Sequence, residues 1–442
     1  MKKIDFVSSK IAENPAFSIF SLIFLLTSLN AIFNMLASEL GYQFPYTTFL
    51  FLPEDRYADY FKVIFSYPGV ENVNFSGSAN ALMHFLQNNP YQGKAGLTEG
   101  ALTHFHMPPL TTLISLLNLK LMHFLNPITI FVSGFLIWFL LVYTLINTFS
   151  KTTLDSWLLF LATLFCYPTL FMTTRGHIFS GISSLALLAF LVFMFQEKRK
   201  FFSLILLAIA VNLRPNAIIF LVVLLMSDFK NLKKEILLFV LISTIVFFTS
   251  LFLANNIYPD YSIHNMLLAI NIYHDKYVIG NGGLAFGSSL FGPLKVIFGY
   301  TKLLEALPVI IAGLMVSIST LQFRNKQISK IAFIFILCSS YVLGSSVIAD
   351  YHLTVFFAPL LCIYLDKKNS LYDHTFFPLN KELLIVFFAS VFVLSPKNYI
   401  YFKYTSIQIA LNPIFLLIAS ILIIVLGCLH PRTTQLNKLN ID

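Results

Sequence analysis

Two acidic residues near the beginning of the chain are spaced for a shared chemical role. The segment PEDRYADYFK, residues 53–62, places Asp55 and Asp59 four residues apart, so that both lie on one face of a helix. Like charges in this relation repel each other. A carboxylate with an ordinary pKa is ionised at neutral pH and can accept a proton from a hydroxyl group. The pair is a candidate general base, and the alternative is a solvated loop acid paired with Arg56 or Lys62.

Two arginines lie beside long apolar segments, where a charge is costly unless it is paired. Arg214 follows the apolar run 201–213 and precedes Pro215, and Arg175 begins the sequence RGH. A guanidinium can bind a phosphate group through two parallel hydrogen bonds. Both arginines are therefore candidates for phosphate binding. The alternatives are snorkelling to the membrane interface and a salt bridge to Asp350.

Four further polar residues complete the set of candidates. His177 lies two residues after Arg175, and His352 ends the sequence DYH. His106 and His104 lie on one face of an extended segment, but a third ligand is not evident nearby, so we expect no metal ion and no other cofactor. Asn281 belongs to the loop sequence GNGG. An ordinary interfacial histidine and a flexible loop are the alternatives for His352 and Asn281.

The composition shows what kind of elements must position these residues. Of the 442 residues, 57% are hydrophobic and 11% are charged, whereas about 25% are charged in soluble proteins. Segments such as AFSIFSLIFLLTSLNAIF have no polar face. We therefore predict an all-α polytopic membrane protein whose first apolar segment is a retained span. The net charge of +9 then reflects membrane topology, and no nucleic-acid partner is expected.

Twelve apolar segments are candidates for transmembrane helices. They lie near residues 17–36, 128–148, 157–173, 178–195, 201–213, 217–226, 236–254, 303–321, 331–348, 354–365, 383–394 and 413–429. The clusters of Lys and Arg between these segments fall on one side of the membrane only under two conditions. The apolar segment 109–125 must not cross the membrane, and NLRPN must separate two short spans. One kinked span at NLRPN is the alternative. The selected arrangement places both termini and most of the 29 basic residues on the cytoplasmic side.

This topology brings the candidate residues to the outer side of the membrane. Both acids lie in a first outer loop of about residues 37–126, and Asn281 lies in a second of about 255–302. RGH, RPN and DYH occupy short outer turns. The chain has no internal repeat, which disfavours a repeat-built transporter. We expect a single membrane domain over residues 1–442.

The order of motifs along the chain resembles that of a known enzyme family. The motifs are DRYADYF, NPYQGK, FHMPPLTTLISL, RGHIFSGISSLALLAF, NLRPNAIIFLVV, GNGGLAFGSSLFG and SSVIADYHLTVFFAPLL. Together they resemble the C-type membrane glycosyltransferases that use polyprenyl-phosphate sugars, specifically the branch with the bacterial mannosyltransferases of phosphatidylinositol mannoside synthesis. The chain departs from this family at Met107, where Tyr is usual, at His177, where Gln is usual, and at Arg214, where Lys is common.

The resemblance implies a function and roles for the candidates. It implies inverting transfer of mannose or another hexose from a polyprenyl-phosphate donor to a lipid or glycan acceptor, on the outer face of a bacterial inner (plasma) membrane. It also implies interfacial helices in the first outer loop. Asp55 precedes Tyr60 by five residues, as the family's essential Asp precedes an aromatic residue, so Asp55 is the first candidate base and Asp59 the second. The residues expected at the donor phosphate or sugar are His106, Arg175, His177, Arg214, Asn281 and His352.

Two other functions are compatible with the sequence. A multi-span transporter or lipid flippase would carry charged residues at mid-span depth, whereas the charges here cluster at the outer ends of the predicted spans. A polysaccharide polymerase or ligase would keep the chemistry and change the acceptor. A long Arg-rich loop late in the chain would favour that function, and the largest loop of this chain is the first.

Overall fold

The regular elements of the protein are almost entirely helices. The computed structural model describes residues 7, 9–11, 13–40, 60, 107–197, 200–226, 229–280, 287–370, 380–396, 401–402, 405–406 and 408–429. Within them the strands are one antiparallel pair, β1 (Tyr401–Phe402) and β2 (Thr405–Ser406). The predicted all-α class is confirmed. Four candidate residues lie outside the described residues: Asp55, Asp59, His106 and Asn281.

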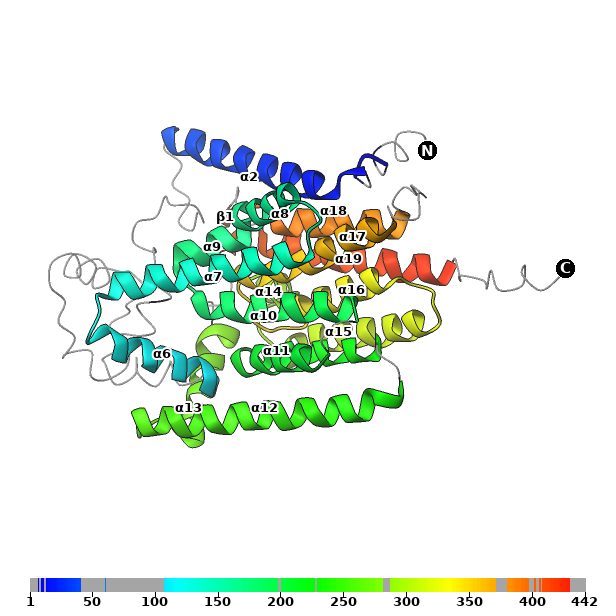
Figure 1. Cartoon of the computed structure of the whole chain (residues 1–442). Helices are drawn as coiled ribbons and strands as arrows, with labels where there is room; N and C mark the ends of the chain where they lie inside the picture. The colour runs from blue at the N-terminus through cyan, green and yellow to red at the C-terminus, as the bar shows by residue number, and fades with distance from the viewer. Residues whose placement is uncertain are drawn as a thin grey trace.

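Among the described residues, six helices are long and apolar enough to cross a membrane, or seven if one bent pair counts as a span. The six are α2 (Pro15–Glu39), α7 (Pro127–Phe149), α10 (Ile178–Phe195), α12 (Phe229–Ile257), α15 (Lys302–Arg324) and α19 (Gln408–Leu429). Most of them run in roughly the same direction (Figure 1). The structure thus supports a bundle of spans but does not by itself give the predicted count of twelve.

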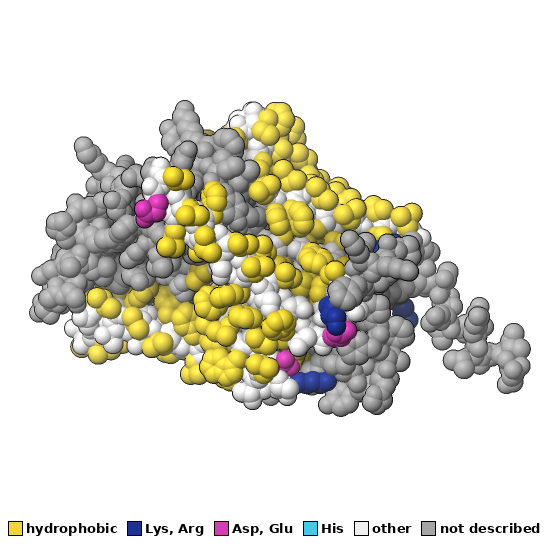
Figure 2. Space-filling view, turned by 90° about the horizontal axis from the view of Figure 1, so that it is seen from above, with side chains coloured by type: hydrophobic (Ala, Val, Ile, Leu, Met, Phe, Trp, Pro, Cys, Tyr) yellow, Lys and Arg dark blue, Asp and Glu magenta, His cyan; other side chains and the backbone are white. Residues whose placement is uncertain are grey.

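The outermost helices present apolar side chains to the outside. On α12, Leu237 and Phe252 are 71% and 65% exposed, and α2 exposes Phe17 and Leu25 in the same way. Figure 2 shows apolar side chains over much of the described surface on one face of the bundle. Such a continuous apolar surface is stable in contact with lipid and not with water. The chain is therefore a membrane protein.

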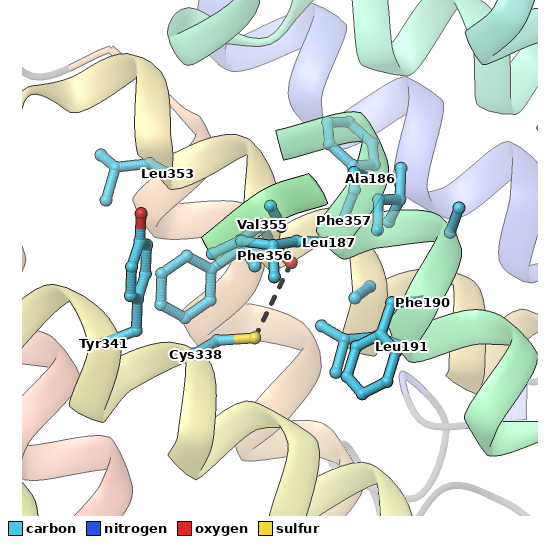
Figure 3. Packing of buried hydrophobic residues seen from close by; sticks show 14 of the residues in the cluster. Ala186, Leu187, Phe190, Leu191, Cys338, Tyr341, Leu353, Val355, Phe356 and Phe357 are labelled. Atoms are coloured by element: carbon cyan, nitrogen blue, oxygen red, sulfur yellow. Dashed lines mark hydrogen bonds between the residues drawn. The ribbon is translucent and has the colours of Figure 1, made fainter. Parts of the chain in front are cut away.

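The inner helices are apolar on all sides because protein surrounds them. Most residues of α10 are buried, and so are all residues of α16 (Lys330–Leu343) after Lys330. Leu187 and Phe190 of α10 pack close to Cys338 of α16 and Phe356 (Figure 3). This core separates the two ends of the bundle and supports the segments that carry the candidate residues.

The predicted span near residues 157–173 is bent. It consists of α8 (Thr153–Phe165) and α9 (Tyr167–Arg175), which meet at an angle of 58°. The break occurs at Cys166, which has an extended backbone. Pro168 lies in the first turn of α9, where its missing N–H is tolerated and where it cannot continue the preceding helix.

The chain is also broken at Arg214, as the NLRPN sequence predicts. α11 (Lys200–Leu213) ends there, and η3 (Pro215–Met226) follows as a 3₁₀ helix. With a rise of about 2.0 Å per residue, twelve residues of 3₁₀ helix extend about 24 Å, compared with about 18 Å for an α-helix. The 3₁₀ form therefore lets a short apolar segment cover more of a bilayer.

The remaining helices are short. They are α6 (Pro109–Met122), α13 (Ile263–Tyr273), the π-helix η4 (His274–Ile279), α14 (Phe291–Phe298), the 3₁₀ helix η6 (Asp350–Phe356), α17 (Phe357–Ser370) and α18 (Lys381–Leu394). α6 packs against α11 and α12, and η6 packs against α9 and α10. These contacts bring η6 to the same region as the start of α10.

Close packing of α15 on α16 generates the first prediction. A Cβ atom on Gly344 would lie 2.8 Å from the Cβ of Ala312 and 3.0 Å from the carbonyl oxygen of Ser340, and neither atom belongs to a flexible side chain. Gly344→Ala should therefore reduce the stability by about 1–3 kcal/mol, measured as a lower thermal unfolding midpoint in detergent. The matched control is Gly313→Ala in α15, where a Cβ would meet no atom within 4 Å. Equal midpoints for the two variants would contradict this packing.

Candidate anion-binding site

Arg214 occupies the junction between α11 and η3, and both its backbone N–H and its backbone carbonyl are hydrogen-bonded there. Its N–H donates to the carbonyl of Ala210 (2.8 Å), and its own carbonyl accepts from the N–H of Ala217 (2.9 Å). The side chain is half-buried. One guanidinium nitrogen donates to Ser180 Oγ at 2.9 Å and lies 3.2 Å from His177 Nε2. The guanidinium is thus directed at the first turn of α10.

The sequence RGH forms the turn that places His177. Gly176 has a left-handed backbone with φ of 78°, which a residue without a Cβ adopts without strain. The N–H of His177 donates to the carbonyl of Met172 (2.9 Å), closing the cap of α9. The same histidine then caps α10, because its Nδ1 accepts from the N–H of Ser180 at 3.3 Å. Two caps therefore fix the imidazole.

The hydrogen-bonding capacity of His177 has a chemical consequence. The Ser180 N–H faces Nδ1, and the Arg214 guanidinium, which can only donate, faces Nε2. A neutral imidazole accepts at only one nitrogen. If Nδ1 accepts the capping bond, Nε2 carries a hydrogen, and the N–H groups of His177 and Arg214 are donors only 3.2 Å apart. With Nε2 protonated, two converging donors, one of them charged, form a site for an oxygen of an anion. With Nδ1 protonated, Nε2 accepts from Arg214, and the Ser180 N–H keeps its bond to the His177 carbonyl at 3.1 Å.

η6 borders the site through Tyr351, which lies beside His177. The ring of Tyr351 lies 4.4 Å from that of His177 and stacks on Phe171. His352 is buried; burial lowers its pKa, and repulsion from Arg214 and then from His177 lowers it further. His352 is therefore neutral at physiological pH, and Arg214 supplies the positive charge of the cluster.

A buried carboxylate fixes the beginning of η6. Asp350 is 3% exposed, and its Oδ2 accepts from the hydroxyl of Tyr167 at 2.9 Å. Its Oδ1 accepts from Ser288 Oγ, which in turn accepts from Asn412 Nδ2 at 2.8 Å. These partners belong to α9, to the segment before α14 and to α19. Asp350 therefore ties three parts of the bundle to the two residues that follow it, Tyr351 and His352.

Two residues of the predicted first outer loop, Tyr60 and Met107, are anchored to other parts of the bundle. Tyr60 is 1% exposed; its hydroxyl donates to Asn118 Oδ1 (3.1 Å), and its ring packs against Phe131 and Phe179. Burial raises the pKa of Tyr60. At the other point, the carbonyl of Met107 accepts from the hydroxyl of Tyr261 at 2.9 Å. These contacts fix Tyr60 beside α6 and α10, and Met107 beside the segment between α12 and α13.

α6 lies beside Arg214. The hydroxyl of Thr111, in the first turn of α6, donates to the carbonyl of Leu213 at 3.4 Å, and Leu213 directly precedes Arg214. α6 begins at Pro109, as the Pro-Pro pair predicts. Its described contacts are with α7, α11 and α12; the prediction that it lies along the membrane remains a prediction.

The structure brings together only part of the predicted set. His177 and Arg214 are in contact, and His352 lies within electrostatic range of both. Arg175 ends α9, where a cation is favourable for the helix dipole, and its guanidinium carbon is 5.8 Å from the ring centre of Phe171. Asp350 accepts from hydroxyl groups, a pairing that the sequence did not indicate. The predicted roles of the four undescribed residues, which include both acids, remain predictions.

Sequence reasoning missed three residues that shape the site. Ser180 and Tyr351 line it, and Tyr167 anchors Asp350. The sequence spacing could have identified Ser180, because the residue three positions after a helix-capping side chain presents its backbone N–H to that side chain. Tyr167 had none, since it lies 183 residues before its partner.

Comparisons of the chain with protein-family models, with curated proteins and with solved structures gave no match. The resemblance in the order of motifs is therefore not supported by these comparisons.

The anchor of η6 gives the second prediction. Tyr167→Phe removes one of the hydroxyl donors of Asp350 while keeping the ring, and an incompletely satisfied buried carboxylate should cost about 1–3 kcal/mol. The readout is the thermal unfolding midpoint in detergent. Tyr143→Phe serves as the control, because Tyr143 is half-buried and packs against Trp157 and Phe160 on the α7–α8 side. If both variants unfold at the wild-type temperature, Asp350 does not depend on Tyr167.

Proposed function

We propose that the protein is a membrane glycosyltransferase that moves mannose or another hexose from a polyprenyl-phosphate donor to a lipid or glycan acceptor. The observation that supports this best is the position of the Arg214 guanidinium beside His177 and Ser180 at the ends of apolar helices. A lipid-linked phosphate presents its anionic group at the end of an apolar chain. The site offers the matching arrangement, a fixed cation at the ends of apolar helices.

The proposed reaction is a single displacement. The acceptor hydroxyl attacks the anomeric carbon, the bond from that carbon to the phosphate oxygen breaks, and the acceptor proton passes to a carboxylate. Polyprenyl phosphate leaves with one more negative charge than it had in the donor. Arg214 and His177 would stabilise that charge as it develops, which is where an electrostatic contact accelerates a reaction. The product has inverted configuration at the anomeric carbon.

Asp55 remains the first candidate for the base and Asp59 the second. The structural support is indirect and comes from Tyr60, which is fixed against Phe179. The ring of Phe179 is 6.2 Å from that of His177. Asp59 is the residue before Tyr60, so their Cα atoms are about 3.8 Å apart. Five residues of chain, at most about 18 Å, separate Asp55 from the same anchor, and both acids are within reach of the site.

The proposed topology has about twelve spans with cytoplasmic termini. The shorter apolar helices α11, η3 and α16, together with α17 and α18, would complete the number begun by the longer helices. The Arg214 end of the bundle would then face the periplasm or the exterior, and the enzyme would reside in a bacterial inner (plasma) membrane. The basic residues of the loops support this orientation.

A transporter or lipid flippase is the second candidate, and one observation favours it. The chain is broken within apolar regions at Cys166 and Arg214 and changes to 3₁₀ helix at Asp350. Discontinuous helices form the substrate sites of many transporters. The two classes differ in product, because a flippase moves a lipid without forming a glycosidic bond.

Substitution of Arg214 provides the third prediction. With purified protein, a polyprenyl-phosphate sugar and extracted acceptor lipid, Arg214→Ala should lower kcat/KM for the donor by roughly two orders of magnitude. Arg214→Lys should retain part of the activity, because the charge remains while the planar fork is lost. Lys120→Ala, at an exposed lysine near the end of α6, is the control and should behave as wild type. Full activity of Arg214→Ala would remove Arg214 from the site.

The fourth prediction concerns the acids. Asp55→Asn keeps the size of the side chain but cannot take the proton, so turnover should fall by about 10²- to 10⁴-fold while the donor still binds. Asp59→Asn should cost less, because it would only adjust the charge near Asp55. Loss of transfer in Asp59→Asn with normal transfer in Asp55→Asn would exchange their roles. Normal transfer in both variants would exclude the pair as the base, and transport without a glycosidic product in the wild type would favour the flippase.

A further inference from the structure

α13 is a short helix outside the six long apolar helices, and most of its side chains are exposed. Ile263, Leu267 and Ile270 follow one line at helical spacing and are 44%, 55% and 40% exposed. His264 and Asn271 are exposed on the adjacent strip, and the exposed Leu268 and Ile272 lie beyond them. Ala269 is buried and marks the side that packs on the protein. Exposed apolar residues with few polar ones, on a helix too short to span a bilayer, favour a position in the membrane interface.

The position of α13 is fixed at the end of a span. Asn255, in the last turn of α12, donates to the carbonyls of Pro259 (3.0 Å) and Tyr261 (2.9 Å). Asn265 donates to the carbonyl of Asp260 at 2.7 Å, and Tyr261 is also bonded to Met107. The turn is therefore rigid, and α13 crosses the end of α12 without continuing its direction (Figure 1). α13 lies where the apolar surface of α12 ends.

Aromatic and basic residues are frequent in the sequence around α13. Tyrosines at positions 258, 273, 277 and 300 are half-buried, and tyrosine is enriched at membrane–water interfaces. The ammonium of Lys276 is 5.6 Å from the ring centre of Tyr277. Val296, Ile297 and Phe298 at the end of α14 are exposed as well. An aqueous loop would not be expected to present so many apolar groups.

We propose that α13 lies in the lipid–water interface at the Arg214 end of the bundle, with Ile263, Leu267 and Ile270 among phospholipid acyl chains and His264 and Asn271 toward the headgroups. Tyr273, the last residue of α13, is close enough to Arg214 for an electrostatic interaction: burial raises the pKa of Tyr273 to about 12, and Arg214 opposes that increase. Tyr261, just before α13, is bonded to Met107, and Thr111 of the adjoining α6 is bonded to Leu213, so that hydrogen bonds also connect α13 to the Arg214 end of the bundle. This placement does not depend on the proposed enzymatic activity.

The test measures which medium reaches each side of α13. Single cysteines are introduced as Leu267→Cys and Asn271→Cys in a Cys428→Ser background, since the other three cysteines are buried. Each is labelled with bimane in phosphatidylcholine nanodiscs, and quenching by a doxyl-labelled phospholipid is compared with quenching by aqueous iodide. Phe252→Cys on the exposed face of α12 is the lipid control, and Asn325→Cys, in the exposed turn that follows α15, is the aqueous control.

We expect the lipid quencher to be several-fold more effective at Leu267→Cys than at Asn271→Cys, and iodide to show the reverse order. Stronger quenching of Leu267→Cys by iodide than by the lipid would place the helix in water and overturn the proposal. Quenching of Leu267→Cys by neither reagent would show that another protein segment or a second copy of the chain covers it, which would also overturn it. Ile263→Cys and Ile270→Cys carry the same expectation if Leu267→Cys fails to fold, as judged by elution and by both controls.

Discussion

The guanidinium of Arg214 is a permanent charge at a break between two apolar helices, and its neighbours must solvate it. A cation in such surroundings is costly unless polar groups or counterions contact it. The hydroxyl of Ser180 and the imidazole of His177 provide the contacts that the structure describes. Neither is an anion, so the cluster keeps a positive charge. The fold stabilises an arrangement that favours an added negative group.

The other segments of this end of the bundle act through that cluster. Gly176 turns the chain so that His177 caps two helices at once. Asp350 fixes the beginning of η6, and η6 presents Tyr351 to the imidazole. Tyr60 attaches the first loop beside Phe179. None of these segments would hold its position alone. The packing of η6 on α10 brings them together into one site.

The sequence was most informative where a single residue restricts the backbone. Pro215 and Gly176 mark the chain breaks at Arg214 and after α9, and both were foreseen from their motifs. The bend at Cys166 was not foreseen. The apolar segment 157–173 is long enough for one span, and this length outweighed the helix-breaking effect of Pro168 in the prediction. The 3₁₀ form of η3 could not be foreseen either, since apolar composition does not distinguish it from an α-helix.

The hydrogen-bond partners of Asp350 show a different limit of prediction from the sequence. The sequence suggested an arginine, because opposite charges in neighbouring outer turns are the simplest pairing. The structure gives hydroxyl groups from Tyr167 and Ser288, which are brought to Asp350 by the packing of distant helices. Such pairings depend on tertiary structure and leave no local pattern. The acids at positions 55 and 59 remain identified by sequence alone.

The most direct test of the account is a cryo-electron microscopy structure of the purified protein in nanodiscs with a polyprenyl phosphate bound. The account predicts phosphate density with oxygens about 3 Å from both the Arg214 guanidinium and His177 Nε2, and the lipid chain leaving between apolar helices. Phosphate density elsewhere on the protein, with the contact between Arg214 and His177 unchanged, would contradict the assignment of this cluster as the anion site.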